Sequence, residues 1–378
     1  MSKVFVCECQ NYEDDAKKSI DNIINTFSSL KGISKKKVII KANLVSAMAP
    51  EKAVTTNYQL IKYLTDYLLS KDCEVTIGDS PGGVFTKPFL NHVYEVSKMT
   101  DTGAKLNNNF STKKIFNEKA KVLKSFEYTA YLDDYDYIIN FSKLKTHAMM
   151  GMSAAVKNMF GTIPGTMKPE YHYRFPKQND FADMLIDLNE YFKADINIVD
   201  GVIGMEGNGP TMGDARKIGC ILASENPYAL DYICSKIINI DYQNVATITQ
   251  SIERKLFDKD KVELNIDIDK LIIKDFVLNK PANSVEFWKD TKNIFVKSIS
   301  KLLPHFLSSK PVVKKKKCVG CKKCANICPM KAIEMYNNIP KIDRKKCIKC
   351  FCCQEFCPKG AMVSKSSFIL KFLHIRKR

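Results

Sequence analysis

Short apolar runs rich in β-branched residues alternate with longer amphipathic stretches through residues 1–283. The short runs have the length of buried strands, and the longer ones repeat apolar residues at helical spacing. Strands are predicted at 4–7, 38–40, 74–78, 137–140, 196–199, 218–223 and 271–274, and helices at 15–30, 57–70, 88–99, 152–160, 180–192 and 227–238. Strands that alternate with helices predict a layered α/β domain with a largely parallel sheet.

The pattern changes after residue 283. Trp288, Phe295, Ile299 and Leu302 recur at helical spacing, which predicts an amphipathic helix over 284–309. Its apolar stripe either packs on the protein, bridging two domains, or lies on a membrane surface, and its mixed charge favours packing. We therefore expect an α/β domain at 1–283, a helix and basic linker at 284–313, a cysteine-rich domain at 314–365 and a basic, apolar tail at 366–378.

Composition adds a strong asymmetry. The chain of 378 residues has a formal net charge of +18. Residues 301–378 hold 20 of its 59 basic residues but only three of its 41 acidic ones, together with nine of its 14 cysteines. No apolar run has the roughly 18 residues that a membrane-spanning helix needs, and the first residues lack the apolar stretch of a signal peptide. We expect a cytoplasmic protein with a small basic domain.

The cysteines of this domain form two CxxCxxCxxxCP runs, the spacing that holds [4Fe–4S] clusters in two-cluster ferredoxins. In this pattern the fourth cysteine of each run completes the other cluster. One cluster is thus predicted on Cys318, Cys321, Cys324 and Cys357, and the other on Cys347, Cys350, Cys353 and Cys328. Zinc ribbons use pairs of CxxC, and disulfides need an oxidising compartment, so both are disfavoured. Cys352 is left as a non-ligand, and residues 317–361 resemble a bacterial two-cluster ferredoxin.

Polar residues gather after several predicted strands of the large domain. Asn140, Lys143, Lys145 and His147 follow one strand within eight residues, which suits an anionic ligand beyond the carboxyl end of a sheet. The alternative is a solvated basic loop. Further candidates after strands or on the next helix are Lys41, Asn43, Asp79, Lys157, Asn158, Asp200, Glu206, Gly207 and Gly209. A shared cleft explains them best.

The glycines of residues 200–213 also suggest a loop whose backbone approaches a ligand. No P-loop lysine follows them, and the third glycine of a dinucleotide site is missing, so a nicotinamide cofactor is disfavoured. The sequence identifies no other cofactor.

Six sequence segments together resemble the domain of unknown function 362 family, whose members are often fused to a C-terminal ferredoxin. They are KANLV (41–45), GDSPGG (78–83), NFSKLKTH (140–147), AAVKNMFG (154–161), DGVIGMEGNGPTMG (200–213) and NPYALD (226–231). The resemblance implies an iron–sulfur redox setting without a defined substrate. Among the candidate residues, it adds Asp231.

Three functions remain open. In the first, an iron–sulfur oxidoreductase, the clusters exchange electrons with a small anionic substrate or cofactor, with His147, Lys145 and Lys143 as catalytic candidates. In the second, an electron-transfer or assembly partner, the basic domain docks an acidic redox protein of the ferredoxin or flavodoxin type. In the third, the basic segments contact an anionic membrane surface peripherally. Nucleic-acid binding is disfavoured because no aromatic stacking platform accompanies the charge.

Overall fold

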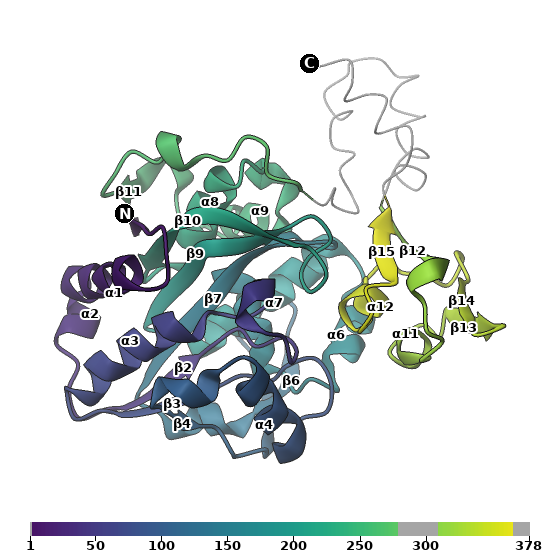
Figure 1. The fold of residues 1–378 in the computed structure, drawn as a ribbon, viewed down its shortest axis with the longest axis horizontal. Coiled ribbons are helices and arrows are strands. Elements are labelled where there is room, and N and C mark those ends of the chain that lie inside the picture. Colours follow the sequence, from purple (N-terminus) through teal and green to yellow (C-terminus); the bar gives the residue numbers. More distant parts are fainter. Residues whose placement is uncertain (1, 279–308, 366–378) are drawn as a thin grey trace.

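The computed structural model describes residues 2–278 and 309–365. In the larger unit a nine-stranded sheet lies between two layers of helices (Figure 1). Its strand order is β11-β1-β10-β9-β7-β2-β3-β4, with β8 paired to β7. Most pairs are parallel, and β10 runs antiparallel to both β1 and β9. The predicted layered α/β fold with a largely parallel sheet is confirmed.

The strands of this sheet are β1 (Ser2–Glu8), β2 (Lys37–Lys41), β3 (Glu74–Gly78), β4 (Lys105–Leu106), β7 (Tyr137–His147), β8 (Gly151–Ser153), β9 (Ile196–Glu206), β10 (Asp214–Ser224) and β11 (Val262–Leu264). A separate hairpin is formed by β5 (Thr112–Phe116) and β6 (Ser125–Thr129). β3 matches its predicted range, whereas the predicted strand at 271–274 is wrong, since a 3₁₀ turn at Asp269–Leu271 leads into irregular chain there.

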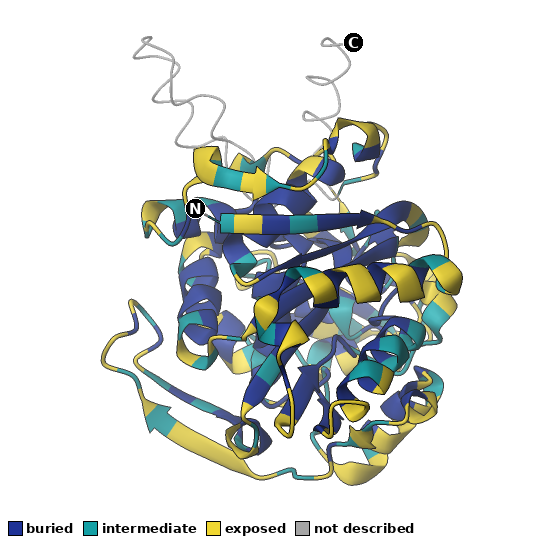
Figure 2. Ribbon diagram, turned by 90° about the vertical axis from the view of Figure 1, so that its left-hand side faces the viewer, coloured by how far each residue is buried: buried dark blue, intermediate teal, exposed yellow. Residues whose placement is uncertain are grey.

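The helices bury one face each against the sheet, and each layer has its own core (Figure 2). One layer contains α1 (Asp14–Thr26), α2 (Ser28–Lys31), α3 (Tyr58–Leu69) and α4 (Lys87–Val96). The other contains α5 (Ala155–Asn158), α6 (Lys168–Arg174), α7 (Gln178–Phe192), α8 (Pro227–Ile237) and α9 (Ala246–Glu253). Ile24 and Leu64 in the first layer and Leu185 and Leu230 in the second are buried, each stabilising the fold by roughly 1.5–3 kcal/mol.

Two strands extend beyond their predicted ends. β7 continues through His147 and β9 continues through Glu206, so the two motifs expected as loops lie largely on strands. Residues 143, 145 and 147 alternate along β7, although the register with β9 shifts between Lys143 and Lys145. The predicted helix at 152–160 is divided into β8, α5 and a 3₁₀ turn at Met159–Thr162. Polar side chains obscured both strands because their partners come from distant parts of the chain.

The smaller unit begins with β12 (Lys310–Val313), which pairs antiparallel with β15 (Met362–Lys365). β12 lies within the range 284–313 that the sequence assigned to the linker. A second hairpin joins β13 (Ile333–Tyr336) to β14 (Ile339–Ile342), and the short helices are α11 (Lys323–Asn326) and α12 (Cys352–Glu355). The predicted helix at 284–309, apart from Ser309, and the tail at 366–378 lie outside the described residues.

Helix α12 faces the larger unit and carries much of the contact between the two (Figure 1). Gln354 Nε2 donates hydrogen bonds to Asn208 Oδ1 at 2.9 Å and to the Gly209 carbonyl at 3.0 Å. Thr211 Oγ1 donates to the Glu355 carbonyl at 3.3 Å. The glycine-rich segment after β9 therefore holds the smaller unit through both side-chain and backbone hydrogen bonds. Within the described ranges, no helix is long and apolar enough to cross a membrane.

Candidate functional site

A cavity of about 740 Å³ lies between the two units. The larger unit contributes the carboxyl ends of β2 and β3, Lys145 of β7 and the segment around α5, as expected for a parallel sheet. The smaller unit contributes Lys323 of α11, Cys352 and Glu355 of α12, and the sequence Phe356-Cys357-Pro358. Of the candidates proposed from the sequence, the cavity is lined by Lys41, Asn43, Asp79, Lys145, Lys157 and Asn158.

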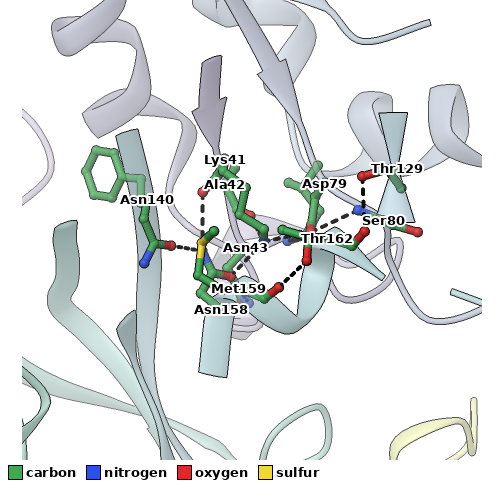
Figure 3. A network of polar contacts seen from close by, with 12 residues as sticks. Lys41, Ala42, Asn43, Asp79, Ser80, Thr129, Asn140, Asn158, Met159 and Thr162 are labelled. Carbon is green, nitrogen blue, oxygen red and sulfur yellow. Dashed lines mark hydrogen bonds and ion pairs between the residues drawn. The ribbon is translucent and has the colours of Figure 1, made fainter. Parts of the chain in front are cut away.

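At the base of the cavity, Lys41 forms a buried ion pair with Asp79 (Figure 3). Lys41 Nζ lies 2.7 Å from Asp79 Oδ1 and also donates to Asn158 Oδ1 at 3.1 Å. The second oxygen of Asp79 accepts a hydrogen bond from the Leu44 backbone at 2.7 Å. Burial lowers the pKa of Lys41, and Asp79 opposes that shift. A Cβ at Gly161 would overlap both side chains, so glycine is required for this approach.

Four asparagine side chains continue the network away from this pair. Asn43 Nδ2 donates to Asn158 Oδ1 at 2.9 Å, and Asn158 Nδ2 donates to Asn140 Oδ1 at 2.8 Å (Figure 3). Asn140 Nδ2 in turn donates to Asn197 Oδ1 at 2.8 Å. This chain of amides fixes the orientation of Asn43 and Asn158, which line the cavity. Asn140 does not line the cavity and contacts Asn158 from the sheet. Such a fully paired buried network is rigid.

Three further lysines, Lys157, Lys168 and Lys323, line the cavity. The ammonium groups of Lys157 and Lys168 lie 5.7 and 5.6 Å from the centre of the Phe160 ring. Lys168 Nζ also donates to the Ser80 carbonyl. Burial lowers the pKa of Lys168 to about 8, and the exposed Lys323 lines the cavity from the smaller unit. The described residues place no carboxylate within ion-pair distance of these three side chains, so the site favours an anion.

Lys143, predicted to contact the substrate, lies away from the cavity lining. Its Nζ is 2.8 Å from Asp200 Oδ2 and donates to the Tyr12 hydroxyl at 2.8 Å. Tyr12 donates to the other oxygen of Asp200 at 3.0 Å, and the Asn57 backbone donates to Asp200 Oδ2 at 3.0 Å. This closed set of contacts joins β7, β9 and the segment before α1. Lys143 and Asp200 therefore hold these elements together and do not line the cavity.

His147 also lies outside the lining and contacts the smaller unit. Its Nε2 is 2.8 Å from Glu355 Oε1, and its Nδ1 accepts hydrogen bonds from the backbones of Met149 and Met150 at 3.2 and 3.1 Å. Because Nδ1 is an acceptor, a neutral ring carries its proton on Nε2, facing the carboxylate. Burial, with Lys157, lowers the pKa of His147 to about 4. Burial raises the pKa of Glu355, but Lys157 and His147 more than offset this and keep it ionised.

The remaining candidates are not brought to the cavity. The Glu206 carboxylate accepts a hydrogen bond from the Val277 backbone, and Gly207 and Gly209 belong to the segment that contacts α12. Asp231 accepts from the backbones of Ala155 and Val156 at the start of α5, and burial raises its pKa to about 7. These residues support the elements around the site.

The eight cysteines with ferredoxin spacing surround two small voids in the smaller unit. One void is lined by Cys318, Cys321, Cys324 and Cys357, and the other by Cys328, Cys347, Cys350 and Cys353. The backbones of Ala332 and Ala361 donate to Cys328 Sγ and Cys357 Sγ, both at 3.2 Å. Thus the residues present fit the predicted clusters. Cys352 also lines the second void and the large cavity, so its role as a non-ligand stays a prediction.

Sequence reasoning missed Glu355, Lys168 and Tyr12. Glu355 carried a usable signal, because it is one of three acidic residues in the last 78 positions and stands between two predicted cluster cysteines. Lys168 and Tyr12 carried none, since their partners lie 88 and 188 residues away in the chain.

The fold and site define an α/β domain joined to a ferredoxin-type iron–sulfur domain. The family described as a domain of unknown function (DUF362) matches residues 38–236, more than half of the chain, so the chain belongs to that family. A 4Fe-4S dicluster domain matches residues 310–358. These matches confirm both parts of the resemblance given by the sequence.

A curated relative is a thylakoid-associated protein of Synechocystis sp., 34% identical over 158 residues. The match covers 41% of this chain and 49% of the relative, so the chain spans about half the length of the relative. The solved lactate racemase apoprotein from Thermoanaerobacterium thermosaccharolyticum gives a TM-score of 0.40 at 12% identity, over 62% of this chain and 57% of the other. A protein from Thermotoga maritima gives 0.38 at 13%, over 60% and 59%. Both structures are too remote to indicate function.

Proposed function

We propose that this protein is an iron–sulfur redox protein that transfers electrons between two [4Fe–4S] clusters and a small anionic substrate or cofactor held in the interdomain cavity. The observation that carries the proposal is that Cys357, a predicted cluster ligand, lines the same cavity as Lys157 and Lys168. When bound, the clusters supply single electrons at low potential. Such oxidoreductase activity is a proposal, as is a cytoplasmic location.

The chain's own residues supply the binding and the shielding. Lys157, Lys168 and Lys323 attract and orient the anionic group, because their ammonium groups have no ion-pair partner within the described ranges. The Lys41–Asp79 pair and the asparagine network hold the cavity floor in one geometry. Phe356 and Pro358 complete the wall next to Cys357, which limits the access of water.

The placement of His147 changes the catalytic role that the sequence suggested for it. Its Nε2 lies next to Glu355. Glu355 lines the cavity, whereas His147 does not line it. We therefore assign His147 the role of positioning Glu355 at the edge of the cavity. Lys143 takes no part in binding, because Asp200 and Tyr12 occupy its ammonium group.

The test is the small molecule that co-purifies with the protein. We expect anaerobically isolated protein to release an anionic metabolite detectable by mass spectrometry, and Lys157→Met to reduce its occupancy about tenfold at unchanged iron content. Lys217→Met, an exposed lysine on β10, is the matched control and should keep the wild-type occupancy. Adding the metabolite to the wild-type holoprotein, with its clusters either oxidised or reduced, should change the cluster absorbance. Equal occupancy in both variants would exclude the cavity as the site.

A second function is favoured by the exposed lysines 314–317, which directly precede the first cluster cysteine. In it, the protein passes electrons to an acidic ferredoxin or flavodoxin, or acts as an assembly partner. A related surface role is peripheral contact with anionic lipid, and it is supported by the name of the thylakoid-associated relative. Docking through these lysines should weaken by about tenfold or more from 50 to 200 mM salt, whereas binding in the enclosed cavity should change little.

A further inference from the structure

Lys145 differs from the two other buried lysines of the site. Lys41 Nζ and Lys143 Nζ each lie within 2.8 Å of a carboxylate oxygen. Within residues 2–278 and 309–365, no carboxylate forms an ion pair with Lys145. Lys145 Nζ instead donates to Asn43 Oδ1 at 2.6 Å and to the Val54 carbonyl at 2.7 Å. Both acceptors are neutral, and the side chain is 1% exposed. A permanent charge at this position would have no opposite charge beside it.

The number of acceptors matches an amine. An ammonium group has three N–H donors, while a neutral primary amine has two N–H donors and one lone pair. The described residues offer Lys145 two acceptors, and these satisfy both hydrogens of an amine. Its remaining position is left for the lone pair, and Lys145 lines the cavity. The asparagine network also fixes the acceptor, since Asn43 Nδ2 is bonded to Asn158.

The surrounding charges act in the same direction. Burial first, and then the positive charges of Lys157 and Lys143, lower the pKa of Lys145 well below its ordinary value. Asp79 and Glu355 oppose the shift without removing it. A lysine that is desolvated and placed near other cations is a nucleophile at neutral pH.

We propose that Lys145 is an amine nucleophile that captures the carbonyl group of a 2-oxo acid in the cavity. The inference deepens the proposed function and rests on it, because Lys157 and Lys168 would hold the carboxylate of such a molecule. The Nζ lone pair attacks the carbonyl carbon, so that a C–N bond forms. The carbonyl oxygen then leaves as water with the two amine hydrogens, and an imine remains. No electrons are gained or lost in this condensation.

Reductive trapping tests the proposal on the full-length holoprotein. The protein is incubated anaerobically at pH 7 with pyruvate, phenylpyruvate or 2-oxoglutarate and sodium cyanoborohydride, and its peptides are mapped by mass spectrometry. We expect saturable labelling of Lys145 by at least one acid, about tenfold above the labelling of Lys41 and Lys143, because each of these two lies beside a carboxylate that favours the ammonium form. Labelling confined to exposed lysines with all three acids would overturn the proposal.

Two variants sharpen the result. Lys145→Arg removes the nucleophile and should abolish the label while the cluster absorbance shows that the protein is folded. Asn43→Asp places a carboxylate beside Nζ, which favours the ammonium form and should reduce the label about tenfold. Unchanged labelling in Asn43→Asp would count against an amine that depends on neutral acceptors.

A measurement without any substrate separates this inference from the proposed function. In competitive labelling with acetic anhydride, an ordinary exposed lysine should react about tenfold faster per pH unit from 6 to 8, because only the amine form reacts. Lys145 should react at a nearly constant rate, and a slope like that of an ordinary lysine would refute the amine. The anion occupancy of Lys157→Met still tests the proposed function, whichever way Lys145 behaves.

Discussion

His147 Nε2 lies 2.8 Å from Glu355 Oε1, so the last residue of β7 contacts the last residue of α12 across the boundary between the two units. The two backbone donors on His147 Nδ1 place the proton of a neutral ring on Nε2, but the direction of this N–H does not give a hydrogen bond to Glu355 Oε1. The two atoms are in close contact and both are buried. The smaller unit is therefore held against the larger one by a close, buried contact at the edge of the cavity.

Glu355→Ala should weaken this docking. The substitution removes the carboxylate that lies 2.8 Å from the buried His147 ring, and we expect it to cost about 0.5–3 kcal/mol. We expect faster amide hydrogen exchange across residues 352–357 than in the wild type. Glu355→Gln keeps an oxygen acceptor and should show a smaller increase. Equal exchange in the wild type and the alanine variant would mean that the contact contributes nothing to docking.

Gly82 and Phe356 predict a steric test of the same interface. A Cβ at residue 82 would lie 2.8 Å from the Phe356 ring, so Gly82→Ala forces the ring to shift. Overpacking of this kind costs about 1–3 kcal/mol. Limited proteolysis should release the smaller unit faster in Gly82→Ala, and the added Phe356→Leu substitution should restore wild-type resistance. Failure of the double variant to recover would show that Gly82 is needed for another reason.

Asp79→Asn should strongly destabilise the larger unit, because it leaves the buried Lys41 without its carboxylate partner. Breaking a buried pair in this way costs about 3–5 kcal/mol. Asp66→Asn provides the control, since Asp66 pairs with Lys62 on the surface and such pairs contribute about 0.3–0.5 kcal/mol. Denaturant unfolding followed by far-UV circular dichroism measures both. A loss at Asp79 as small as that at Asp66 would contradict the expected role of burial.

The sequence predicted the layered fold well because β1, β3 and α3 are locally consistent: apolar runs and helical repeats agree with what each element buries. It failed at β7, where Lys143 and Lys145 interrupt the apolar pattern of a buried strand. Their partners, Asp200 for Lys143 and Asn43 for Lys145, lie 57 and 102 residues away. No local pattern contains that information.

The site was predictable in part for the same reason. Lys41 ends β2 and Asp79 directly follows its parallel neighbour β3, so the rule that ligands lie beyond strand ends placed both at one edge. His147 and Glu206 also follow predicted strands, but the strands continue through them. The contribution of the smaller unit required the docked arrangement, which the spacing of its cysteines does not encode.

Cysteine substitutions test the cluster ligands. Cys357→Ser removes a thiolate from the void that borders the cavity and should reduce iron from about eight to about four per chain, or lower if the second cluster is lost too. Cys352→Ser should keep the wild-type iron and sulfide content, because the two ferredoxin runs supply eight ligands without it. Iron loss in Cys352→Ser would instead make Cys352 a ligand of the second cluster, whose void it lines.

His172 predicts how stability responds to acid. Its ring stacks on Phe181 at 4.3 Å, its Nδ1 has no hydrogen-bond partner among the described residues, and burial lowers its pKa to about 3. The unfolded chain, with a histidine pKa near 6.5, therefore binds one more proton than the folded chain between these values. Stability attributable to neutral His172 is complete above pH 6.5 and is lost as the pH falls, by about 1.4 kcal/mol per pH unit.

His172→Phe keeps the stack but cannot take up that proton. Between pH 6.5 and 5.0 the wild type should lose about 2 kcal/mol more free energy of unfolding than the variant, as measured by denaturant titration at each pH. The other titrating groups are common to both proteins, so the difference in slope isolates His172. Parallel pH profiles would mean that the histidine is protonated in the folded protein, and an acceptor would then have to lie at its Nδ1.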